Sequence, residues 1–460
     1  MMANTNLTFY GGVGTTTGAN FLVEFESSKF LVDCGLLQGV QGAESYNSSP
    51  FQYDPKEIKV LFITHAHIDH IGRIPKLVKD GFKGQIFSTP ETKEISGHLL
   101  EDALRIMLNK RRHDQDHPLP YEERHIREAL DLWDTKEYRE QWQFAPSAMA
   151  NFKDAGHILG SAMVELKLGS TKIVFTGDLG NSPSPLLADT EGIKDADYIV
   201  VESVYGDRNH ESQTERRTKF KQVILETIER KGEVVIPAFS VDRTQVILYE
   251  LNNMVEDGEI PSVPVFLDSP LASKITEIYK KSTHLFNDKI KKEISAGDNV
   301  FDFPQLKIID SKKESLGLGH TPGSKIIIAG SGMSEGGRVL AHEARILGGA
   351  QNTLLLMGYQ SVGSLGRKLE EGAKEIQIWN EGKMERLRVR ARVENVHGYS
   401  AHKDSTHLIE FVEKASSPEL KKVFVVLGEP RSSLFLAQRL RDYVGVDAIY
   451  PETGKTYDLT

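Results

Sequence analysis

The sequence predicts an α/β protein in which one domain interrupts another. Three observations lead to this prediction: a strand-rich opening, an alternation of helices and strands that begins near residue 207, and a return of the first pattern near residue 390. Strands that alternate with helices are typical of parallel βαβ units. We therefore expect a first domain formed by residues 1–206 together with 391–460, and an inserted domain over residues 207–390.

The opening stretch contains three short apolar segments, NLTFYG, FLVEF and KFLVDCG, with glycine-rich turns between them. Segments of this length and composition predict β-strands. The glycines at positions 11, 12, 14 and 18 lack the spacing of a dinucleotide-binding loop, and a second strand follows where that loop requires a helix. They indicate hairpin turns rather than a cofactor site.

The middle of the chain has longer helical stretches between short apolar runs. QTERRTKFKQVILETIERKG and RTQVILYELNNMV have the length of helices, whereas EVVIPAF, VPVFLDSP and KIIIAGSG have that of strands. This order predicts a parallel sheet with crossover helices. VFVVLGE and SSLFLAQRLRDYVG then return to the first domain with a strand and a helix.

Composition is that of a soluble globular chain of 460 residues, with a formal net charge of -9. The acidic balance excludes a general electrostatic attraction to nucleic acid, so a polyanion site must be a local basic or metal-lined cleft. Cys34 is the only cysteine, which excludes an intrachain disulfide and a four-cysteine zinc module. The N-terminus lacks the features of a secretion signal, and the apolar runs fall far short of the ~20 residues of a membrane helix. We expect a cytoplasmic protein without a membrane partner.

A dense group of metal-ligand types directly follows a predicted buried strand. The strand is KVLFIT, residues 59–64, and the group is HAHIDH. Alternate residues of an extended segment share a face, so His65 and His67 point the same way, whereas Asp69 and His70 lie on the turn into a helix. This spacing offers ligands to two neighbouring ions. Imidazole and carboxylate without thiolate suit zinc or a similar divalent ion.

A paired site also needs a bridging carboxylate and a further histidine. The chain offers Asp178, at the end of KIVFTGD, and His157, in DAGHILGSA. Taken alone, FTGD is explained as a side-chain cap and DAGH as a turn. Hydrogen-bonded surface histidines are the alternative for HAHIDH, but such a density of ligands beside a strand end favours a metal site.

HAHIDH, DAGHILGSA and FTGD, in this order, resemble the metallo-β-lactamase family. The resemblance implies an αββα sandwich whose metal ions lie at strand ends. The ligands that it implies are His65, His67 and His157 for one Zn²⁺, and Asp69 and His70 for a second, with Asp178 bridging the two.

A long insertion separates ESVYGDR from GYSAHKD. Glu202 in the first segment and His402 in the second resemble the first two signature motifs of the β-CASP nucleases. IPAFSVDRTQ, DSPLA, GSGMSEGGRVL and GYQSVGSLGRKL resemble the bacterial relatives of the pre-mRNA 3′-end-processing endonuclease in that family. The implied architecture is a metallo-β-lactamase domain with an inserted β-CASP domain of parallel βαβ type.

Phosphodiester hydrolysis is the chemistry that this set of residues supports. Two divalent ions can share a hydroxide and deliver it to phosphorus. His402 would protonate the departing oxygen as general acid, Glu202 would orient His402, and Asp69 would accept a proton from the attacking water. Taken singly, Glu202 is better explained as a solvated strand-end acid and His402 as a helix-cap histidine. The leading hypothesis is a zinc-dependent ribonuclease that cuts single-stranded RNA to 5′-phosphate and 3′-hydroxyl ends.

Phosphate contacts are predicted in two places. The segment SGMSEGGR begins with Ser331 and Gly332, whose backbone amides are candidates for an anion-binding turn, and ends at Arg338. Ser400 is a candidate donor to a phosphate beside His402. The alternative for SGMSEGGR is a plain turn between a strand and a helix.

One position departs from the family pattern. RNA-cutting members carry a histidine in V-H-G-E, where this sequence has Val426-Leu427-Gly428-Glu429, and DNA-processing members carry valine. Leu427 cannot bind a metal, so the second Zn²⁺ site is expected to be weak. His397 and Glu429 are the nearby residues that could compensate.

RNA remains the expected partner, because the rest of the insertion resembles RNA-processing members, and DNA is the alternative substrate. A small-molecule hydrolase of the lactonase or thioesterase type would leave the insertion and the Glu202–His402 pair unexplained. The retention of six metal-ligand positions argues against a weakly active partner subunit, whereas Leu427 leaves that alternative open. The sequence also leaves a homodimer open.

Overall fold

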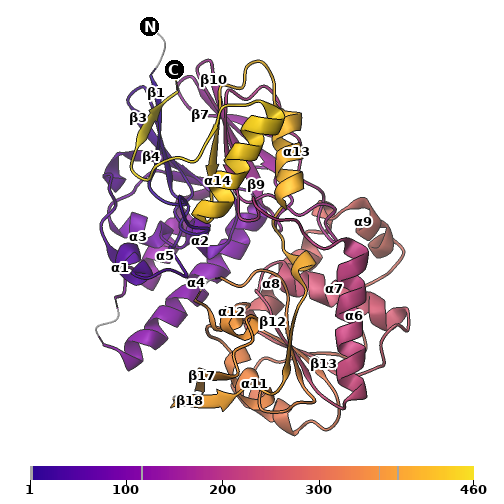
Figure 1. Cartoon of the computed structure of the whole chain (residues 1–460). Helices are drawn as coiled ribbons and strands as arrows, with labels where there is room; N and C mark the ends of the chain where they lie inside the picture. Colours follow the sequence, from indigo (N-terminus) through magenta and orange to yellow (C-terminus); the bar gives the residue numbers. More distant parts are fainter. Residues whose placement is uncertain (1–3, 116–117, 362, 381–382, 460) are drawn as a thin grey trace. The chain divides into compact units, whose positions relative to one another are not determined.

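The computed structural model describes residues 4–115, 118–361, 363–380 and 383–459. The chain forms two compact units (Figure 1). The first unit contains residues 1–209 and 402–460, and the second contains residues 210–401. The second unit is thus inserted into the sequence of the first. The expected domain boundaries, after residues 206 and 390, stay a prediction.

The described part of the first unit contains a seven-stranded sheet in the order β22-β1-β2-β3-β4-β5-β6. Neighbours from β3 to β6 are parallel, whereas β1 pairs antiparallel with β2 and β22. The strands are β1 (Thr5–Phe9), β2 (Phe21–Phe25), β3 (Ser28–Val32), β4 (Ile58–Phe62), β5 (Gln85–Ser88), β6 (Trp133–Thr135) and β22 (Thr456–Asp458). Because β4 ends at Phe62, HAHIDH begins just beyond the carboxyl end of a central strand.

The second sheet of this unit has the order β21-β20-β11-β10-β9-β8-β7. Its strands are β7 (Gln141–Ala145), β8 (Ala148–Asp154), β9 (Ala162–Leu168), β10 (Thr171–Phe175), β11 (Tyr198–Glu202), β20 (Lys422–Val426) and β21 (Ala448–Ile449). β11 precedes the insertion and β20 follows it, and the two strands pair in parallel with Glu202 opposite Val426. The chain therefore returns from the second unit to the strand next to the one it left.

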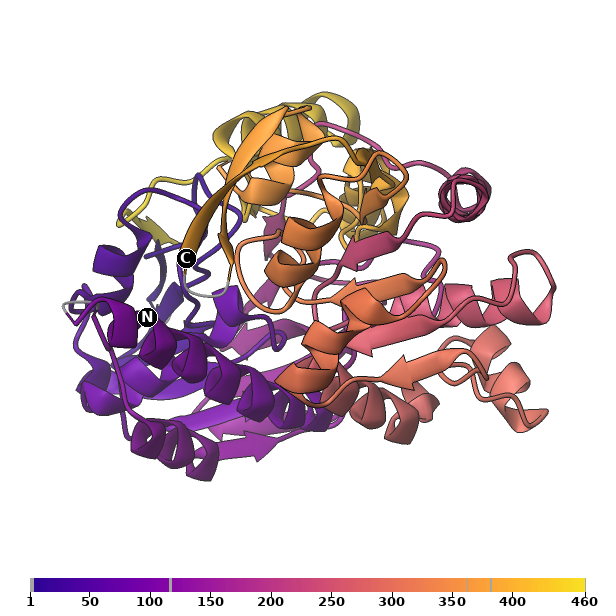
Figure 2. The same ribbon diagram turned by 90° about the horizontal axis from the view of Figure 1, so that it is seen from below.

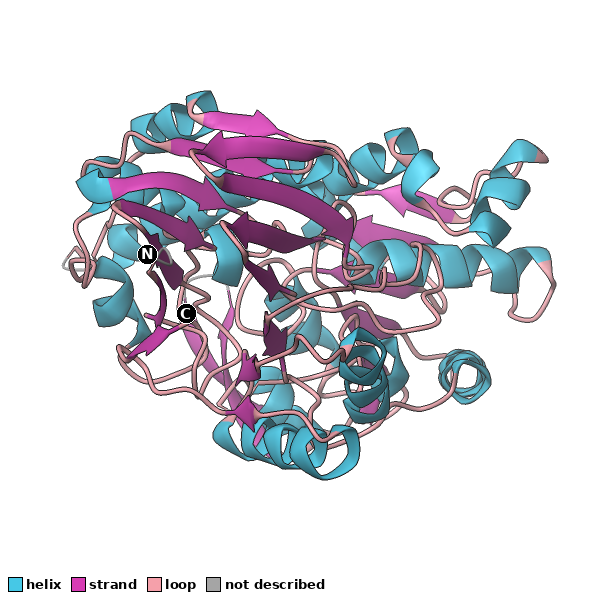
Figure 3. Ribbon diagram, turned by 90° about the horizontal axis from the view of Figure 1, so that it is seen from above, coloured by secondary structure: helices cyan, strands magenta, loops and turns pink. Residues whose placement is uncertain are grey.

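The two sheets share one apolar core, which contains Phe9, Phe21, Phe152, Phe175 and Phe424. Two further clusters lie on the outer faces of the sheets, where helices cover them (Figure 3). Burial on both faces explains why β4, β10 and β20 read as continuous apolar runs. The order helix, sheet, sheet, helix confirms the predicted αββα sandwich.

The helices of the first unit lie on these outer faces. They are α1 (Ala43–Ser48), α2 (Ile68–Ile71), α3 (Ile74–Lys79), α4 (Pro90–His113), α5 (Glu123–Asp131), α13 (Ser405–Ala415) and α14 (Pro430–Arg439). A short 3₁₀ helix lies at Pro55–Glu57, and a short π-helix lies at Leu440–Val444. No helix in the described ranges is both long and apolar enough to span a bilayer.

The second unit is built on a six-stranded parallel sheet in the order β14-β13-β15-β12-β16-β19 (Figure 2). The strands are β12 (Val234–Pro237), β13 (Val265–Asp268), β14 (Leu306–Ile308), β15 (Ile326–Ala329), β16 (Thr353–Leu356) and β19 (Arg392–Asn395). Because every neighbouring pair is parallel, helices must carry the crossovers. This arrangement confirms the predicted parallel βαβ domain.

Seven helices connect these strands in the described part of the unit. They are α6 (Gln213–Glu229), α7 (Arg243–Glu256), α8 (Pro270–Lys281), α9 (Asp288–Ser295), α10 (Lys312–Gly317), α11 (Val339–Ile346) and α12 (Leu365–Glu370). Short 3₁₀ turns lie at Thr283–Leu285, Leu318–His320 and His397–Tyr399. A separate antiparallel hairpin is formed by β17 (Glu375–Asn380) and β18 (Lys383–Arg388).

Candidate metal centre

HAHIDH lies where β4 gives way to α2, at the carboxyl end of the first sheet. His65 is buried in the extended segment, and His67 is the residue before the first turn of α2. Asp69 and His70 lie within that turn, as the sequence spacing indicated. Their backbone is held by its own hydrogen bonds, since the amides of His70 and Ile71 donate to the carbonyl of His67. These hydrogen bonds fix the path of the backbone that carries Asp69 and His70.

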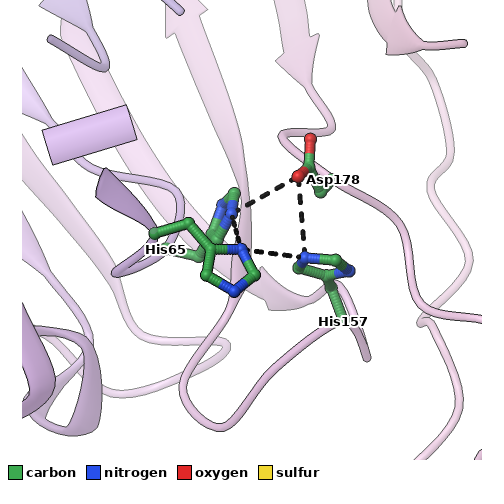
Figure 4. Close-up of side chains that lie close together, drawn as sticks. His65, His157 and Asp178 are labelled. Carbon is green, nitrogen blue, oxygen red and sulfur yellow. Dashed lines mark hydrogen bonds and ion pairs between the residues drawn. The ribbon is translucent and has the colours of Figure 1, made fainter. Parts of the chain in front are cut away.

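One cluster of ligand atoms joins three histidines and Asp178. His65 Nε2 lies 3.1 Å from His67 Nδ1, and His157 Nε2 lies 3.2 Å from the same atom. Asp178 Oδ2 lies 3.4 Å from His65 Nε2 and 3.5 Å from His157 Nε2. Figure 4 shows the rings of His65 and His157 and the carboxylate of Asp178 facing one another. One ligand atom from each of the four residues lies within 4.8 Å of all the others.

A second group begins at the other oxygen of the same carboxylate. Asp178 Oδ1 lies 3.5 Å from His70 Nε2, and that nitrogen lies 4.0 Å from Asp69 Oδ2. His70 Nε2 and Asp178 Oδ1 are buried, and neither donates to or accepts a hydrogen bond from any described residue. Asp178 thus presents one oxygen to each group, an arrangement in which a single carboxylate can serve two ions.

Glycine positions Asp178 at the end of β10. Gly177 has a φ of 52°, and a Cβ there would come within 2.6 Å of Thr64 Cβ. Only glycine combines this left-handed backbone with so close an approach. The turn FTGD therefore carries Asp178 over the start of HAHIDH on the neighbouring sheet.

Asp33, which was not predicted as a site residue, contacts the ring nitrogen of His70 that does not face Asp178. Asp33 Oδ2 lies 2.7 Å from His70 Nδ1, and the carboxylate also accepts hydrogen bonds from Thr64 N and Thr64 Oγ1 at 2.9 and 2.8 Å. With Nδ1 engaged in this way, His70 turns Nε2 towards Asp178. In the sequence, Asp33 is visible as the acidic residue that follows the strand in KFLVDCG. That strand, β3, pairs with β4 in the sheet.

The electrostatics of the two groups fit a divalent cation. Burial lowers the pKa of His65 well below its usual value, and the neighbouring rings of His70 and His67 lower it further, so His65 is neutral and its nitrogen lone pair is available. Burial raises the pKa of Asp178 to about 7. A cation would favour the ionised carboxylate and use the ring nitrogens as ligands. The donor set is therefore suited to the metal that the sequence predicted.

Glu202 and His402 form a further pair beside Asp178. Glu202 is fully buried at the end of β11, where its carboxylate accepts hydrogen bonds from Leu179 N at 2.6 Å and Val204 N at 3.3 Å. His402 Nδ1 lies 3.3 Å from Glu202 Oε1 and 3.8 Å from Asp178 Oδ2. Burial alone would lower the pKa of His402, but Glu202 and Asp178 raise it to about 9. His402 is thus held in its charged, proton-carrying form.

Leu427 packs in the core and contributes no ligand atom. It follows β20 with a φ of 51°, its amide donates to the carbonyl of Gly12 at 2.7 Å, and its side chain belongs to the cluster between the sheets. Glu429 is the residue before α14, and His397 lies in the second unit, where its Nε2 is 3.5 Å from Glu370 Oε1. Neither of these two residues joins the groups of close ligand atoms found among the described residues.

The residues predicted to contact phosphate lie in the second unit. Arg338 is already engaged, because Nη1 donates to Asp268 Oδ1 at 2.6 Å and Nη2 donates to the carbonyl of Asp310 at 2.7 Å. Ser331 Oγ accepts a hydrogen bond from the amide of Glu335 at 3.1 Å, as in an ordinary turn. Gly332 and Ser400 are buried. Phosphate binding by these four residues stays a prediction, and the structure gives Arg338 a role in anchoring the turn.

Three family models match the chain. The metallo-beta-lactamase superfamily matches residues 13–238, and the Beta-Casp domain matches residues 244–369. The Zn-dependent metallo-hydrolase RNA specificity domain matches residues 386–451. Together the three matches cover most of the chain, and the Beta-Casp match lies wholly within the second unit.

Curated relatives resemble the chain over nearly its full length. Ribonuclease TTHA0252 of Thermus thermophilus is 32% identical over 94% of this chain and 95% of its own. An RNase J-like protein of Methanocaldococcus jannaschii is 32% identical over 97% of this chain and 98% of its own. Transcription termination factor FttA of Methanosarcina mazei is 31% identical over 94% of this chain and 68% of its own.

Among solved structures, a protein of unknown function from Enterococcus faecalis V583 covers 99% of this chain and is itself covered completely, with a TM-score of 0.54 and 13% identity. At this identity the likeness shows a shared fold.

Proposed function

Because the chain belongs to the β-CASP family of metallo-β-lactamase-fold nucleases, we propose that it is a metal-dependent ribonuclease that hydrolyses single-stranded RNA to 5′-phosphate and 3′-hydroxyl ends. The observation that carries this proposal is the position of Asp178. Its two oxygens face two separate groups of ligand atoms, and the Glu202–His402 pair lies beside it. A small-molecule hydrolase would need neither the pair nor the inserted unit.

The residues proposed to hold two Zn²⁺ ions form two sets, and Asp178 belongs to both. They are His65, His67 and His157 on one side, and Asp69 and His70 on the other, with Asp178 shared. When bound, the ions would supply the Lewis-acid charge that phosphodiester hydrolysis requires. Asp33 keeps His70 oriented through Nδ1, which is the role that carboxylates commonly have behind metal-binding histidines.

Two groups of the chain are proposed to move protons. Asp69 accepts the proton that the attacking water loses as its oxygen bonds to phosphorus. His402 gives a proton to the 3′ oxygen as the bond between that oxygen and phosphorus breaks. Since Nδ1 of His402 faces Glu202, Nε2 is the nitrogen that gives the proton. The buried carboxylate of Glu202 keeps the ring charged and correctly turned before the reaction begins.

RNA is proposed as the substrate in preference to DNA. Relatives that are similar over almost the whole chain are named as a ribonuclease and an RNase J-like protein. Leu427 is the one observation that favours DNA, because the family's DNA-processing members also carry an apolar residue there. Matched RNA and DNA strands of one sequence therefore belong in the same assay.

The experiment follows cleavage of an end-labelled single strand by purified full-length protein. We expect cleavage of RNA, loss of cleavage after metal is removed by a chelator, and recovery when Zn²⁺ is returned. Asp178→Ala and His67→Ala should be inactive although they remain folded. Asp131→Ala, at the exposed end of α5, is the control and should cut at the wild-type rate. Undiminished cleavage by Asp178→Ala, or a clear preference for DNA, would overturn the proposal.

A further inference from the structure

The hairpin of β17 and β18 has one covered face and one open face. Ile376 and Ile378 are buried in a cluster that contains Val339 and Ile346 of α11, so one face of the hairpin packs on that helix (Figure 1). The register places Trp379 opposite Met384, and Gln377 opposite Arg386. Side chains directly opposite each other lie on the same face of a sheet, so these four residues share the open face.

Two large apolar side chains are exposed on that face. Trp379 is 46% exposed and Met384 is 58% exposed. The other two tryptophans of the chain, Trp133 and Trp142, are only 3% and 9% exposed. A solvent-exposed tryptophan is unusual, and aromatic rings at such positions commonly provide a stacking platform for unpaired bases.

A row of arginines continues from the same strand. Residues 386–392 read RLRVRAR, and the four arginines are exposed whereas the residues between them are buried or half-buried. Arg386 and Arg388 lie on one face of β18, ~7 Å apart, because alternate residues of a strand point the same way. Arg390 follows two residues beyond the strand, and Arg392 begins β19 after a bend at Ala391. The row therefore offers the positive charge that a nucleic-acid backbone attracts.

The ends of the row are paired with carboxylates, but its middle is not. Arg386 Nε donates to Glu375 Oε2 at 3.0 Å, and Arg392 Nη1 donates to Glu226 Oε2 at 2.7 Å. No ion pair joins Arg388 or Arg390 to an acidic residue within the described ranges. Glu375 lies opposite Arg388 in the register, but its carboxylate is paired with Arg386. Arg388 and Arg390 thus add local positive charge to a chain whose net charge is -9.

We infer that this face of the hairpin binds single-stranded RNA through residues other than those of the metal centre. Trp379 stacks on a base, and Arg388 and Arg390 bind phosphates. The inference rests on the proposed function, because it names a further contact of the same substrate. The contrasting explanation is that the charges only protect an exposed strand edge from aggregation, as charged residues often do.

Tryptophan fluorescence tests the stacking contact directly. Because Trp133 and Trp142 are buried in the first unit, Trp379 is the tryptophan that added RNA can quench. We expect a long single-stranded RNA to quench the tryptophan fluorescence of the full-length protein within the first moments after mixing, before cleavage. Trp379→Phe keeps an aromatic ring, so it should lose the quenching but bind RNA nearly as tightly. Trp379→Ala should bind the long strand roughly 5- to 100-fold more weakly.

Charge reversal tests the arginine row. The double variant Arg388→Glu with Arg390→Glu should weaken binding of the long strand. The slope of the logarithm of the binding constant against the logarithm of salt concentration should become shallower by about one unit for each lost phosphate contact. The matched control reverses Arg124 and Arg127, two exposed arginines of α5 that are paired with Glu122 and Glu123, and should change neither quantity. Cleavage of a dinucleotide reporter should stay at the wild-type rate in all these variants.

The outcomes separate this inference from the proposed function. If RNA neither quenches Trp379 nor binds more weakly to the variants while RNA cleavage is intact, the RNA-binding face is wrong and the proposed function stands. Aggregation of the charge-reversed protein with unchanged RNA affinity would instead support the edge-protection explanation and overturn the site. If the wild-type protein cuts no RNA but RNA still quenches Trp379, the proposed function fails and the RNA-binding face remains.

Discussion

Asp33 and His70 are 37 positions apart in the sequence, yet Asp33 Oδ2 lies 2.7 Å from His70 Nδ1 in the interior of the first unit. Both side chains are completely buried. This contact determines which nitrogen of His70 faces Asp178, and it places a negative charge behind a proposed metal ligand. The role of Asp33 is therefore one of positioning, and it is open to a conservative test.

Asp33→Asn should weaken metal binding and leave the fold intact. Asp33 has a φ of 60°, which asparagine tolerates better than most residues, so the backbone is expected to keep its path. Loss of a carboxylate behind a metal-binding histidine commonly costs 10- to 100-fold in affinity, and we expect about that here. Calorimetric titration of metal-free protein with Zn²⁺ measures it. Asp54→Asn, at an exposed turn, is the control, and equal affinities of the two variants would contradict the role assigned to Asp33.

Loss of the Glu202–His402 pair should slow the reaction more than it weakens substrate binding. His402→Gln and Glu202→Gln should each lower kcat by about 10²- to 10⁴-fold with little change in KM, because the pair acts on the leaving oxygen. The double variant should be about as slow as the worse single variant, because the two residues act as a unit. Steady-state cleavage of labelled RNA measures these constants.

A second histidine–carboxylate pair on α13 supplies the control for that experiment. His407 Nδ1 lies 2.7 Å from Asp404 Oδ1, outside the groups of close ligand atoms. His407→Gln should leave kcat unchanged. A loss of activity at His407 as large as that at His402 would mean that the assay reports general damage to this region.

Leu427→His should make the thermal stability of the protein depend more strongly on bound metal. Without metal, an imidazole in place of a buried leucine should destabilise the protein by about 2–4 kcal/mol. With Zn²⁺, the new ligand should strengthen the second site, so the difference in Tm between metal-loaded and metal-free protein should widen. Leu427→Met is the control and should cost less than about 1.5 kcal/mol without changing that difference. If the difference does not widen for the histidine variant, position 427 serves packing alone.

Glu343→Gln should flatten the dependence of stability on pH. Glu343 is buried in α11, where it accepts a hydrogen bond from Ser334 Oγ, and burial raises its pKa from 4.5 to about 8. Between these two pH values the folded protein holds a proton that the unfolded chain releases, so the free energy of unfolding falls as pH rises. The glutamine variant lacks this loss, and its stability relative to wild type should increase from pH 4.5 to about 8.

Urea unfolding at a series of pH values measures that difference. Glu335→Gln, an exposed change next to Ser334, is the control and should keep the wild-type slope. A slope that is unchanged in Glu343→Gln would show that this carboxyl group is ionised in the folded protein and that the burial argument fails.

Local patterns in the sequence determined much of this molecule. The alternation of helices and strands near residue 207 predicted the parallel sheet, because parallel neighbours need a connection long enough to hold a helix. The spacing of HAHIDH predicted which ligands share a face, because alternate residues of an extended segment point the same way. Those inferences use only neighbours in the chain, whereas His157 and Asp178 come from distant segments that the structure brings beside His65 and His67.

Only the tertiary structure decided which distant groups meet. Asp33 was visible as a strand-end acid, but nothing in KFLVDCG says that its partner is His70. Arg338 is predicted to contact phosphate, but only the structure shows that Asp268 and the carbonyl of Asp310 already hold its guanidinium. Trp379 could equally have been a core residue. The physical reason is the same in each case. Which groups contact a side chain depends on sheet order and packing, and these are not encoded in the distance between residues along the chain.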